Sequence, residues 1–310
     1  MGKGKARTTR ECAKIIERAC LTGVGFACEE GRMKPRILLP LLLLLPFPDG
    51  RSIPQQTVDP KQAALTAYAH FKALTPAELN ELLSKAQSGD AEAQFWVGSI
   101  YAEGTKPKNL EEGARWLLKS AEQGYAPAQR AYGLMSRLAN PSVGERWMLR
   151  AAEQGDTEAQ FWLGVAYEQN WFGTIDHQES LKWYKRAAEG GDPDAQVELG
   201  QEYEDGEGVE QNYKLAAEWF RRAAEHVPDL GGAGQGRNRL GLLYMEGLGV
   251  PLDYAQAYFW FSLNGPEANT TEAKTHLSPA QIREADRLVK EWKEQHRVSP
   301  EVAAAPHIEN

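Results

Sequence analysis

The chain has 310 residues, 42% of them hydrophobic and 25% charged, so it can bury a core as one large domain or two small ones. Its formal net charge is −8. Because residues 1–36 carry nine Lys/Arg against four Asp/Glu, residues 37–310 have a net charge of −13. A protein domain this acidic offers no cluster of cations to displace the counterions of phosphate groups, which excludes nucleic acid as a partner.

The three cysteines lie together near the start of the chain, at Cys12, Cys20 and Cys28. From residue 29 onward the chain therefore has no disulfide framework, no thiol nucleophile and no cysteine metal site. Their even spacing of eight lacks the short two-to-four-residue knuckle that zinc sites favour. We predict no bound metal and no cofactor.

Residues 33–52 have the pattern of a secretory signal peptide. Lys34 and Arg36 form a basic start, and the apolar run Ile37–Phe47 follows. Eleven residues make about 16 Å of helix, too short to span a bilayer but typical of a signal core. We expect cleavage within residues 50–56, and no stable membrane insertion after it. The alternative is a short buried helix or hydrophobic anchor in a cytoplasmic protein.

Because signals begin at the N-terminus, residues 1–32 are interpreted as an upstream, non-native extension, with Met33 as the true start. The mature protein is then expected to be exported, to a bacterial periplasm or outside the cell. A cytoplasmic location is the alternative.

Residues 57–88 are predicted to form N-terminal capping helices. Asp59-Pro60 begins one helix. Thr75-Pro76-Ala77-Glu78 is a capping box with proline at the first helical position, and it begins a second helix.

The segment from residue 89 to residue 264 repeats itself. The letters "EAQFW" at 92–96 return at 158–162, and alignment of the two copies reveals five copies of a two-part pattern. The first part contains a central glycine, at Gly98, Gly133, Gly164, Gly200 and Gly241; the second contains a tryptophan, at Trp116, Trp147, Trp183, Trp219 and Trp260. The five repeats are placed at 89–123, 124–154, 155–190, 191–227 and 232–264.

Both parts of each repeat have apolar residues at helical spacing, and a glycine turn lies between them. Gly206 and Gly208 can take the positive φ that the end of a helix needs. A glycine inside the first helix indicates close approach by a neighbour. Because neither helix can bury its apolar stripe alone, successive helix pairs must stack. The predicted fold is therefore all-α, a solenoid.

The pattern resembles the Sel-1-like repeat, a relative of the tetratricopeptide repeat. The fourth copy carries the family motif almost entire: Ala195, Leu199, Gly200, Tyr203, Gly206, Gly208, Val209, Ala216, Trp219, Ala223 and Ala224. The resemblance implies a right-handed α-solenoid of helix-turn-helix repeats that binds another protein or peptide. Roles that it implies include regulation at the bacterial envelope. Repeats two and three depart from the motif, because they lack the glycine turn.

After the repeats, residues 276–296 are predicted to form a C-terminal capping helix. Ser278-Pro279-Ala280-Gln281 begins it with a second capping box. The tail at 297–310 is predicted to be disordered.

The sequence offers no catalytic motif. The six histidines are scattered, and neither a nucleophile elbow nor a phosphate-binding loop is present. The glycine-rich run Gly231–Gly236 is interpreted as a flexible entry into repeat five. We therefore predict no catalytic residues and a non-enzymatic scaffold, with a hydrolase as the less favoured alternative.

Two tryptophans that the repeat motif does not require are the candidate binding residues. Trp96 and Trp162 have largely polar neighbours at helical spacing, and large aromatics often anchor interfaces. They could lie on the concave, first-helix surface; the alternative is that the rings pack into the next repeat. Sugar stacking on exposed tryptophans is a second alternative. The candidate partner-binding residues are Glu92, Trp96, Ser99, Glu103, Glu158, Trp162 and Gln169, with Trp171 and Phe172 as a second pair.

Acidic residues accompany these tryptophans, which favours a basic partner. The sequence does not decide the oligomeric state. The acidic companions are Glu92, Glu103, Glu158, Glu168, Glu202 and Glu204.

Overall fold

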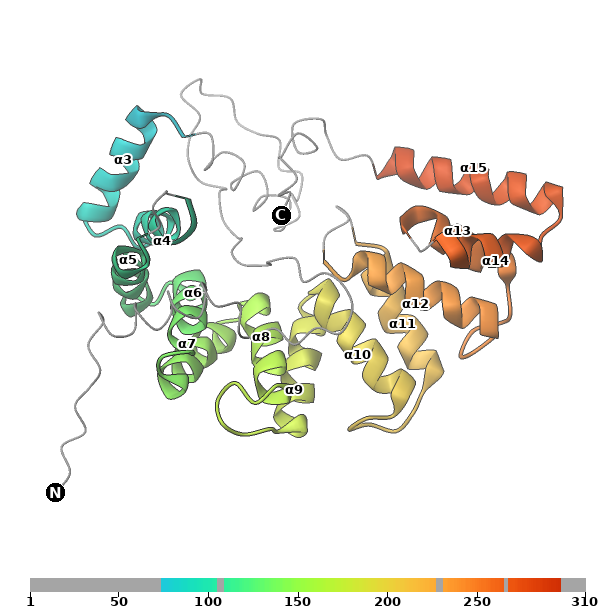
Figure 1. Ribbon diagram of the computed structural model, residues 1–310, viewed down its shortest axis with the longest axis horizontal. Coiled ribbons are helices and arrows are strands. Elements are labelled where there is room, and N and C mark those ends of the chain that lie inside the picture. The colour runs from blue at the N-terminus through green and yellow to red at the C-terminus, as the bar shows by residue number, and fades with distance from the viewer. Residues whose placement is uncertain (1–73, 105–108, 227–230, 265–266, 297–310) are drawn as a thin grey trace. The chain divides into compact units, whose positions relative to one another are not determined.

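The computed structural model describes residues 74–104, 109–226, 231–264 and 267–296 (Figure 1). Residues 1–32, the expected signal at 33–52, the expected helix at Asp59 and the tail at 297–310 lie outside the described residues. Within the described ranges every regular element is helical and there is no strand. The all-α prediction is thus confirmed.

The helices follow one another with short connections. The first is the cap α3 (Pro76–Gln87), and the last two, after the repeats, are α14 (Glu267–Thr275) and α15 (Pro279–Gln295). The repeat helices between them are α4 (Ala91–Ser99) with a π-helical extension η1 (Ile100–Gly104), α5 (Leu110–Glu122), α6 (Ala126–Ser136), α7 (Pro141–Glu153), α8 (Thr157–Glu168), α9 (His177–Glu189), α10 (Pro193–Asp205), α11 (Tyr213–Ala224), α12 (Ala233–Glu246) and α13 (Tyr254–Asn264).

The described residues fall into two compact units. One contains 74–159 with 171–173, and the other contains 160–170 with 174–296, so the division lies within α8. Within each unit a helix packs against the helices before and after it in the chain, as α10 does against α9 and α11. This is the stacking that the apolar stripes predicted.

The central glycine of each repeat lets the second helix approach the first. A methyl group added at Gly200 would lie 2.5 Å from the Phe220 ring, and one at Gly98 would lie 2.8 Å from the Leu117 side chain. In every repeat the residue that fills this space directly follows the repeat tryptophan; these residues are Leu117, Met148, Tyr184, Phe220 and Phe261. The predicted close approach is confirmed.

The repeat tryptophans lie on the second helices and are buried or half-buried. In repeats one to four a cation three residues later in the same helix lies over the indole ring. The distances to the ring centroid are 4.4 Å for Lys119 on Trp116, 4.7 Å for Arg150 on Trp147, 4.9 Å for Arg186 on Trp183 and 4.3 Å for Arg222 on Trp219. Such cation–π pairs cover the outer side of each ring.

The glycine turns have the predicted geometry. Gly206 and Gly208 have φ values of 76° and 73°, in the left-handed region that only glycine adopts at little cost. In repeat three, which lacks this turn, Asn170 takes a φ of 61° instead. Asparagine tolerates that conformation, which explains how the degenerate loop still ends its helix.

A glutamine near the start of several first helices ties each repeat to the preceding one. The side-chain amides of Gln94, Gln129 and Gln196 donate to the carbonyl oxygens of Ala86, Ala121 and Ala188, at 3.0, 3.1 and 3.1 Å. Each of these carbonyls also accepts from the amide of the glycine three residues later, so the glutamine adds a second donor at the end of the preceding helix.

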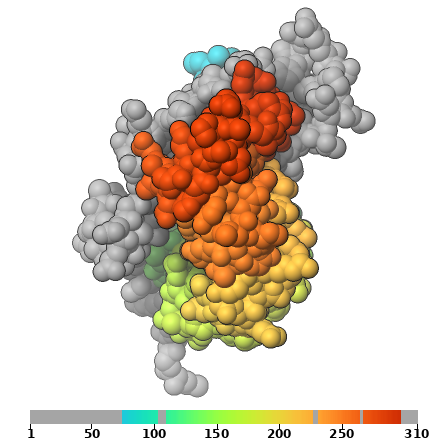
Figure 2. Space-filling model, turned by 90° about the vertical axis from the view of Figure 1, so that its right-hand side faces the viewer, coloured from blue at the N-terminus to red at the C-terminus, as the bar shows by residue number. Residues whose placement is uncertain are grey.

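The two predicted capping boxes, at Thr75 and Ser278, are both present. After the repeats, α15 packs on α13, and its Val289 and Trp292 cover the core of repeat five. Figure 2 shows these last helices, in red, lying across the orange helices of that repeat.

The glycine-rich run at 231–236 is not the flexible entry that was predicted. Most of it belongs to α12, which begins at Ala233. A methyl group at Gly236 would lie 2.8 Å from Ala223 Cβ, so this glycine allows close packing of α12 against α11.

Candidate functional site

The first candidate, Trp96, is not exposed. Its relative exposure is 8%, and its ring packs edge-on against Phe95 at 5.0 Å between centroids. Its Nε1 donates to Glu92 Oε1 over 3.4 Å, and burial raises the pKa of Glu92. Ser99 is also buried and donates to the Phe95 carbonyl oxygen at 3.0 Å. Here the packing alternative is correct, because Trp96 belongs to a buried core cluster that includes Ala128 and Ala131 of the next repeat.

Another candidate partner-binding residue, Glu158, belongs to a partly buried ion cluster. The guanidinium of Arg130, 1% exposed, lies 2.9 Å from Asp156 and 2.6 Å from Glu158. Asp156 also caps α8 by accepting from the Ala159 amide at 2.7 Å. Arg130 therefore links α6 to the start of α8. The side chain of Glu103 lies outside the described part of the chain.

The second copy of the tryptophan, Trp162, is half-buried and packs edge-on against Phe161 at 5.3 Å. Gln169, at the end of the same helix, is exposed. Trp171 and Phe172 are half-buried, and the guanidinium of Arg137 lies 4.2 Å from the centroid of the Trp171 ring. Burial of Trp96 removes its ring from the surface that sugar stacking would need.

A group of carboxylates gathers on α8 and α10. Glu168 accepts a hydrogen bond of 2.8 Å from the hydroxyl of Tyr184, and Glu198 and Glu202 lie close enough to Glu168 to interact electrostatically with it. All four residues belong to the second unit. We call Glu168, Glu198 and Glu202 the carboxylate cluster.

The cluster is short of positive charge. Burial, followed by repulsion from Glu168, raises the pKa values of Glu198 and Glu202 to about 7. Arg239 lowers the pKa of Glu198, but its guanidinium is 3.4 Å from Glu204 and 3.3 Å from the side-chain oxygen of Gln201. His177 lowers the pKa of Glu202. Burial and repulsion outweigh both cations, so a further cation would be stabilised here.

The structure thus groups the predicted residues differently from the sequence. Glu92 with Trp96, and Glu158 with Arg130, lie in the first unit, whereas Trp162 and Gln169 lie in the second. Sequence reasoning did not identify Glu198 as a candidate. The signal for it was its repeat position, because Glu198, Trp96 and Trp162 each lie two residues before the central glycine of their repeat.

Within the described ranges no group of three or more His, Cys, Asp or Glu side chains is arranged to hold a metal ion. No helix among the described residues is long and apolar enough to cross a membrane.

Comparison with known families gives five matches along this chain. The model described as Sel1 repeat matches residues 91–125, 128–156, 157–192, 193–226 and 235–263, which is over half of the chain. A comparison with curated proteins found no match.

Two solved structures support the same grouping. One is c5321, a protective antigen of uropathogenic Escherichia coli strains displaying an SLR fold, with 28% identity, a TM-score of 0.63 and coverage of 78% of this chain. This chain spans only 55% of that protein. The other is a Sel1 repeat protein from Oxalobacter formigenes, with 25% identity, a TM-score of 0.51, and coverage of 77% of this chain and 96% of that one.

Proposed function

Because this chain belongs to the Sel1 repeat family, whose members generally mediate protein–protein interactions, we propose that it is a non-enzymatic scaffold for a basic segment of another protein. The observation that supports a basic partner is the carboxylate cluster on α8 and α10. Its raised pKa values mean that the charged forms of Glu198 and Glu202 are poorly compensated within the chain.

A lysine or arginine of the partner would change this balance. A cation within about 4–6 Å favours the ionised form of a carboxylate, so binding would lower both pKa values and release protons. The half-buried ring of Trp162 lies on α8, the helix that carries Glu168, and would offer apolar contact to the same partner. Binding should therefore strengthen as the pH rises through 7.

The test begins with capture by the immobilised chain at pH 8 and measurement of the affinity of a captured protein. Glu198→Gln/Glu202→Gln should weaken binding about tenfold or more, since each lost charge pair is worth about 1 kcal/mol or more. Glu210→Gln/Glu218→Gln is the matched control, because both residues are exposed in the same repeat. Equal affinity of the cluster variant and the control variant would contradict the proposal.

We also propose that the chain acts outside the cytoplasm, in a bacterial periplasm or beyond. The basis is the sequence of residues 33–52 alone. Sequencing of the mature protein from its native host should give an N-terminus within residues 50–56. Recovery of the intact first residue from the cytoplasm would contradict export without affecting the proposed scaffold.

A further inference from the structure

One repeat position in the second unit holds three different kinds of side chain. Trp162, Glu198 and Arg239 each lie two residues before the central glycine of their repeat, on the first helices α8, α10 and α12. Because successive repeats stack in the same way, equivalent positions fall side by side. Helix α12 packs on α10, and Arg239 interacts electrostatically with Glu198. A cation of the neighbouring repeat therefore lies next to the carboxylate cluster.

Two long contacts hold Arg239 on α10. Its Nη1 lies 3.4 Å from Glu204 Oε2, and its Nη2 donates to the side-chain oxygen of Gln201 at 3.3 Å. Both distances exceed the value of about 3.2 Å that bounds most N–H···O hydrogen bonds. The Arg239 side chain is 39% exposed, so water competes for its donors. The guanidinium is thus loosely held.

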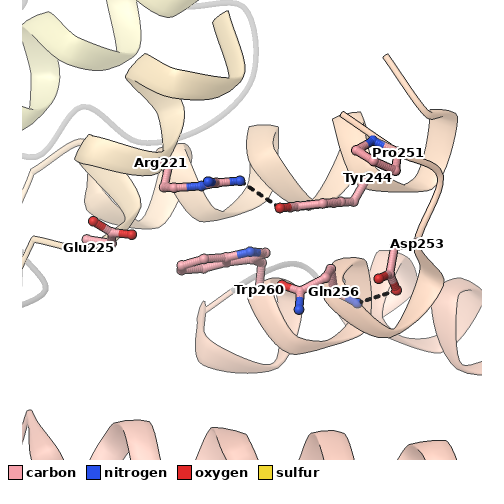
Figure 3. Close-up of a pocket in the computed structure, with 7 residues that line it drawn as sticks. All are labelled: Arg221, Glu225, Tyr244, Pro251, Asp253, Gln256 and Trp260. Carbon is pink, nitrogen blue, oxygen red and sulfur yellow. Dashed lines mark hydrogen bonds between the residues drawn. The ribbon is translucent and has the colours of Figure 1, made fainter. Parts of the chain in front are cut away.

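Two other arginines are held more firmly. In the first unit the guanidinium of Arg130 has carboxylate oxygens at 2.9 and 2.6 Å. In the second unit Arg221 lines a pocket of about 430 Å³ between α11 and α13, and Figure 3 shows its Nη2 donating to the Tyr244 hydroxyl, at 2.7 Å. Arg221 is exposed as well, so exposure alone does not explain the long contacts of Arg239.

The guanidinium of Arg239 is shared between two carboxylates. Burial, followed by repulsion from the other two carboxylates of the cluster, raises the pKa of Glu198, and Arg239 offsets only part of this rise. Burial also raises the pKa of Glu204, again against the effect of Arg239. One loosely held cation therefore lies near two carboxylates and compensates neither of them fully.

We propose that Arg239 competes with the partner for the carboxylate cluster. In the free chain it shields Glu198, and when a lysine or arginine of the partner reaches Glu198, the guanidinium of Arg239 closes onto Glu204. Its two long contacts allow this movement without the loss of a strong bond. The inference rests on the proposed function, because it concerns the regulation of the same cluster. Arg239 thereby weakens the binding of every basic partner and reserves the cluster for those that make further contacts.

The test uses a capped peptide rather than the natural partner. Acetyl-Gly-Arg-Gly-Arg-Gly-amide is titrated into the ¹⁵N-labelled full chain at pH 8, with the peptide that carries citrulline at both arginine positions as the uncharged reference. Binding is followed at the indole N–H signal of Trp162, which is assigned by its loss in Trp162→Phe. Arg239→Gln should bind the arginine peptide about threefold more tightly than the wild type, since a partly exposed charge pair has an effect of this size.

A double-mutant cycle with Glu204 separates competition from a general change of charge. Glu204→Gln removes the carboxylate onto which Arg239 closes, so this variant should bind the arginine peptide about threefold more weakly than the wild type. In the Arg239→Gln background the same change should alter the affinity by about 1.5-fold or less. Arg221→Gln removes an equal charge at the pocket of Figure 3, and should bind as the wild type does.

A variant that failed to fold would lose affinity, so a gain in affinity cannot come from misfolding. Unchanged or weaker binding by Arg239→Gln, an equal gain in Arg221→Gln, or equal effects of Glu204→Gln in the two backgrounds would each overturn the proposal. So would the absence of saturable binding by both the wild type and Arg239→Gln. If Glu198→Gln/Glu202→Gln binds the peptide as tightly as the wild type, the proposed function fails too. If it loses affinity while Arg239→Gln has no effect, only the competition is contradicted.

Discussion

The two units each contain a partly buried group of charged side chains at the first helices, but positive and negative charges are balanced differently in the two groups. In the first unit Arg130 lies between Asp156 and Glu158, at 2.9 and 2.6 Å. In the second unit Glu168, Glu198 and Glu202 lie together, and two of their pKa values rise to about 7. Charged side chains at equivalent places in this type of repeat can therefore pair with one another and join two helices, or stay unpaired and available to a partner.

The largest expected effect comes from removing the cation of the first group. Arg130→Met would leave the buried carboxylate of Asp156 and the half-buried carboxylate of Glu158 without a counter-ion, and should lower the free energy of unfolding by about 3–5 kcal/mol. Urea unfolding at pH 7 measures the change. Arg130→Phe with Asp156→Asn and Glu158→Gln should recover most of it, since phenylalanine occupies this position in repeats one and three. A loss below about 1 kcal/mol for Arg130→Met would show that the cluster is not structural.

A packing change near the carboxylate cluster provides a comparison, because its effect on stability should not depend on pH. Gly200 is two residues after Glu198, and a methyl group there would lie 2.5 Å from the Phe220 ring. Gly200→Ala should destabilise the chain by about 1–3 kcal/mol at pH 5 and at pH 8 alike. Phe220→Leu in the same chain should recover part of the loss, because leucine lacks the ring atoms Cε1 and Cζ, which would lie 2.5 and 3.1 Å from the added methyl group. A strong pH dependence of the Gly200→Ala effect would contradict this account.

Removing one charge from the carboxylate cluster should stabilise the chain at high pH. The folded-state pKa of Glu198, about 7, exceeds its ordinary value of 4.5, so the folded chain holds the proton more tightly than the unfolded chain. The resulting stability is complete below pH 4.5 and is lost as the pH rises through 7. Glu198→Gln should therefore raise the free energy of unfolding by about 2 kcal/mol at pH 8, relative to its effect at pH 4.

The measurement is thermal or urea unfolding of both proteins between pH 4 and pH 9. Glu218→Gln, at an exposed position, serves as the control and should change the pH dependence little. If wild type and Glu198→Gln show parallel pH profiles, the cluster is better compensated than the structure indicates.

The smallest expected effect is that of Gln123→Glu in the first unit. This change removes the donor to the side-chain oxygen of Gln94, and should lower the free energy of unfolding by about 1 kcal/mol. Urea unfolding measures the change, with Glu122→Gln at the exposed neighbouring position as the control. An unchanged free energy of unfolding for Gln123→Glu would show that the bond between the two glutamines does not stabilise the chain.

Much of the fold could be predicted because the signals are local and periodic. The capping boxes at Thr75 and Ser278 depend on residues only three positions apart, and both are present. The positive φ of Gly206 and Gly208 follows from the residue type. The burial of Phe220 against Gly200 follows from a spacing that recurs in all five repeats. The expected signal, first helix and tail lie outside the described residues and stay predictions.

The candidate site was predicted less well, because burial of a side chain depends on which helix of another repeat covers it. Trp96 and Ser99 have polar neighbours along α4, yet both are buried, and Trp96 shares a core cluster with residues of the next repeat. Arg130 occupies a position that holds phenylalanine in repeats one and three, and only the approach of Asp156 and Glu158 makes it a suitable core residue.

The sequence by itself determined the repeat, its helix pairs, its caps and its glycine contacts, because each depends on neighbouring residues or on a fixed period. The tertiary structure decided which charges are paired. Whether Glu198 meets a cation or another carboxylate depends on side chains that the stacking of helices brings together from distant positions.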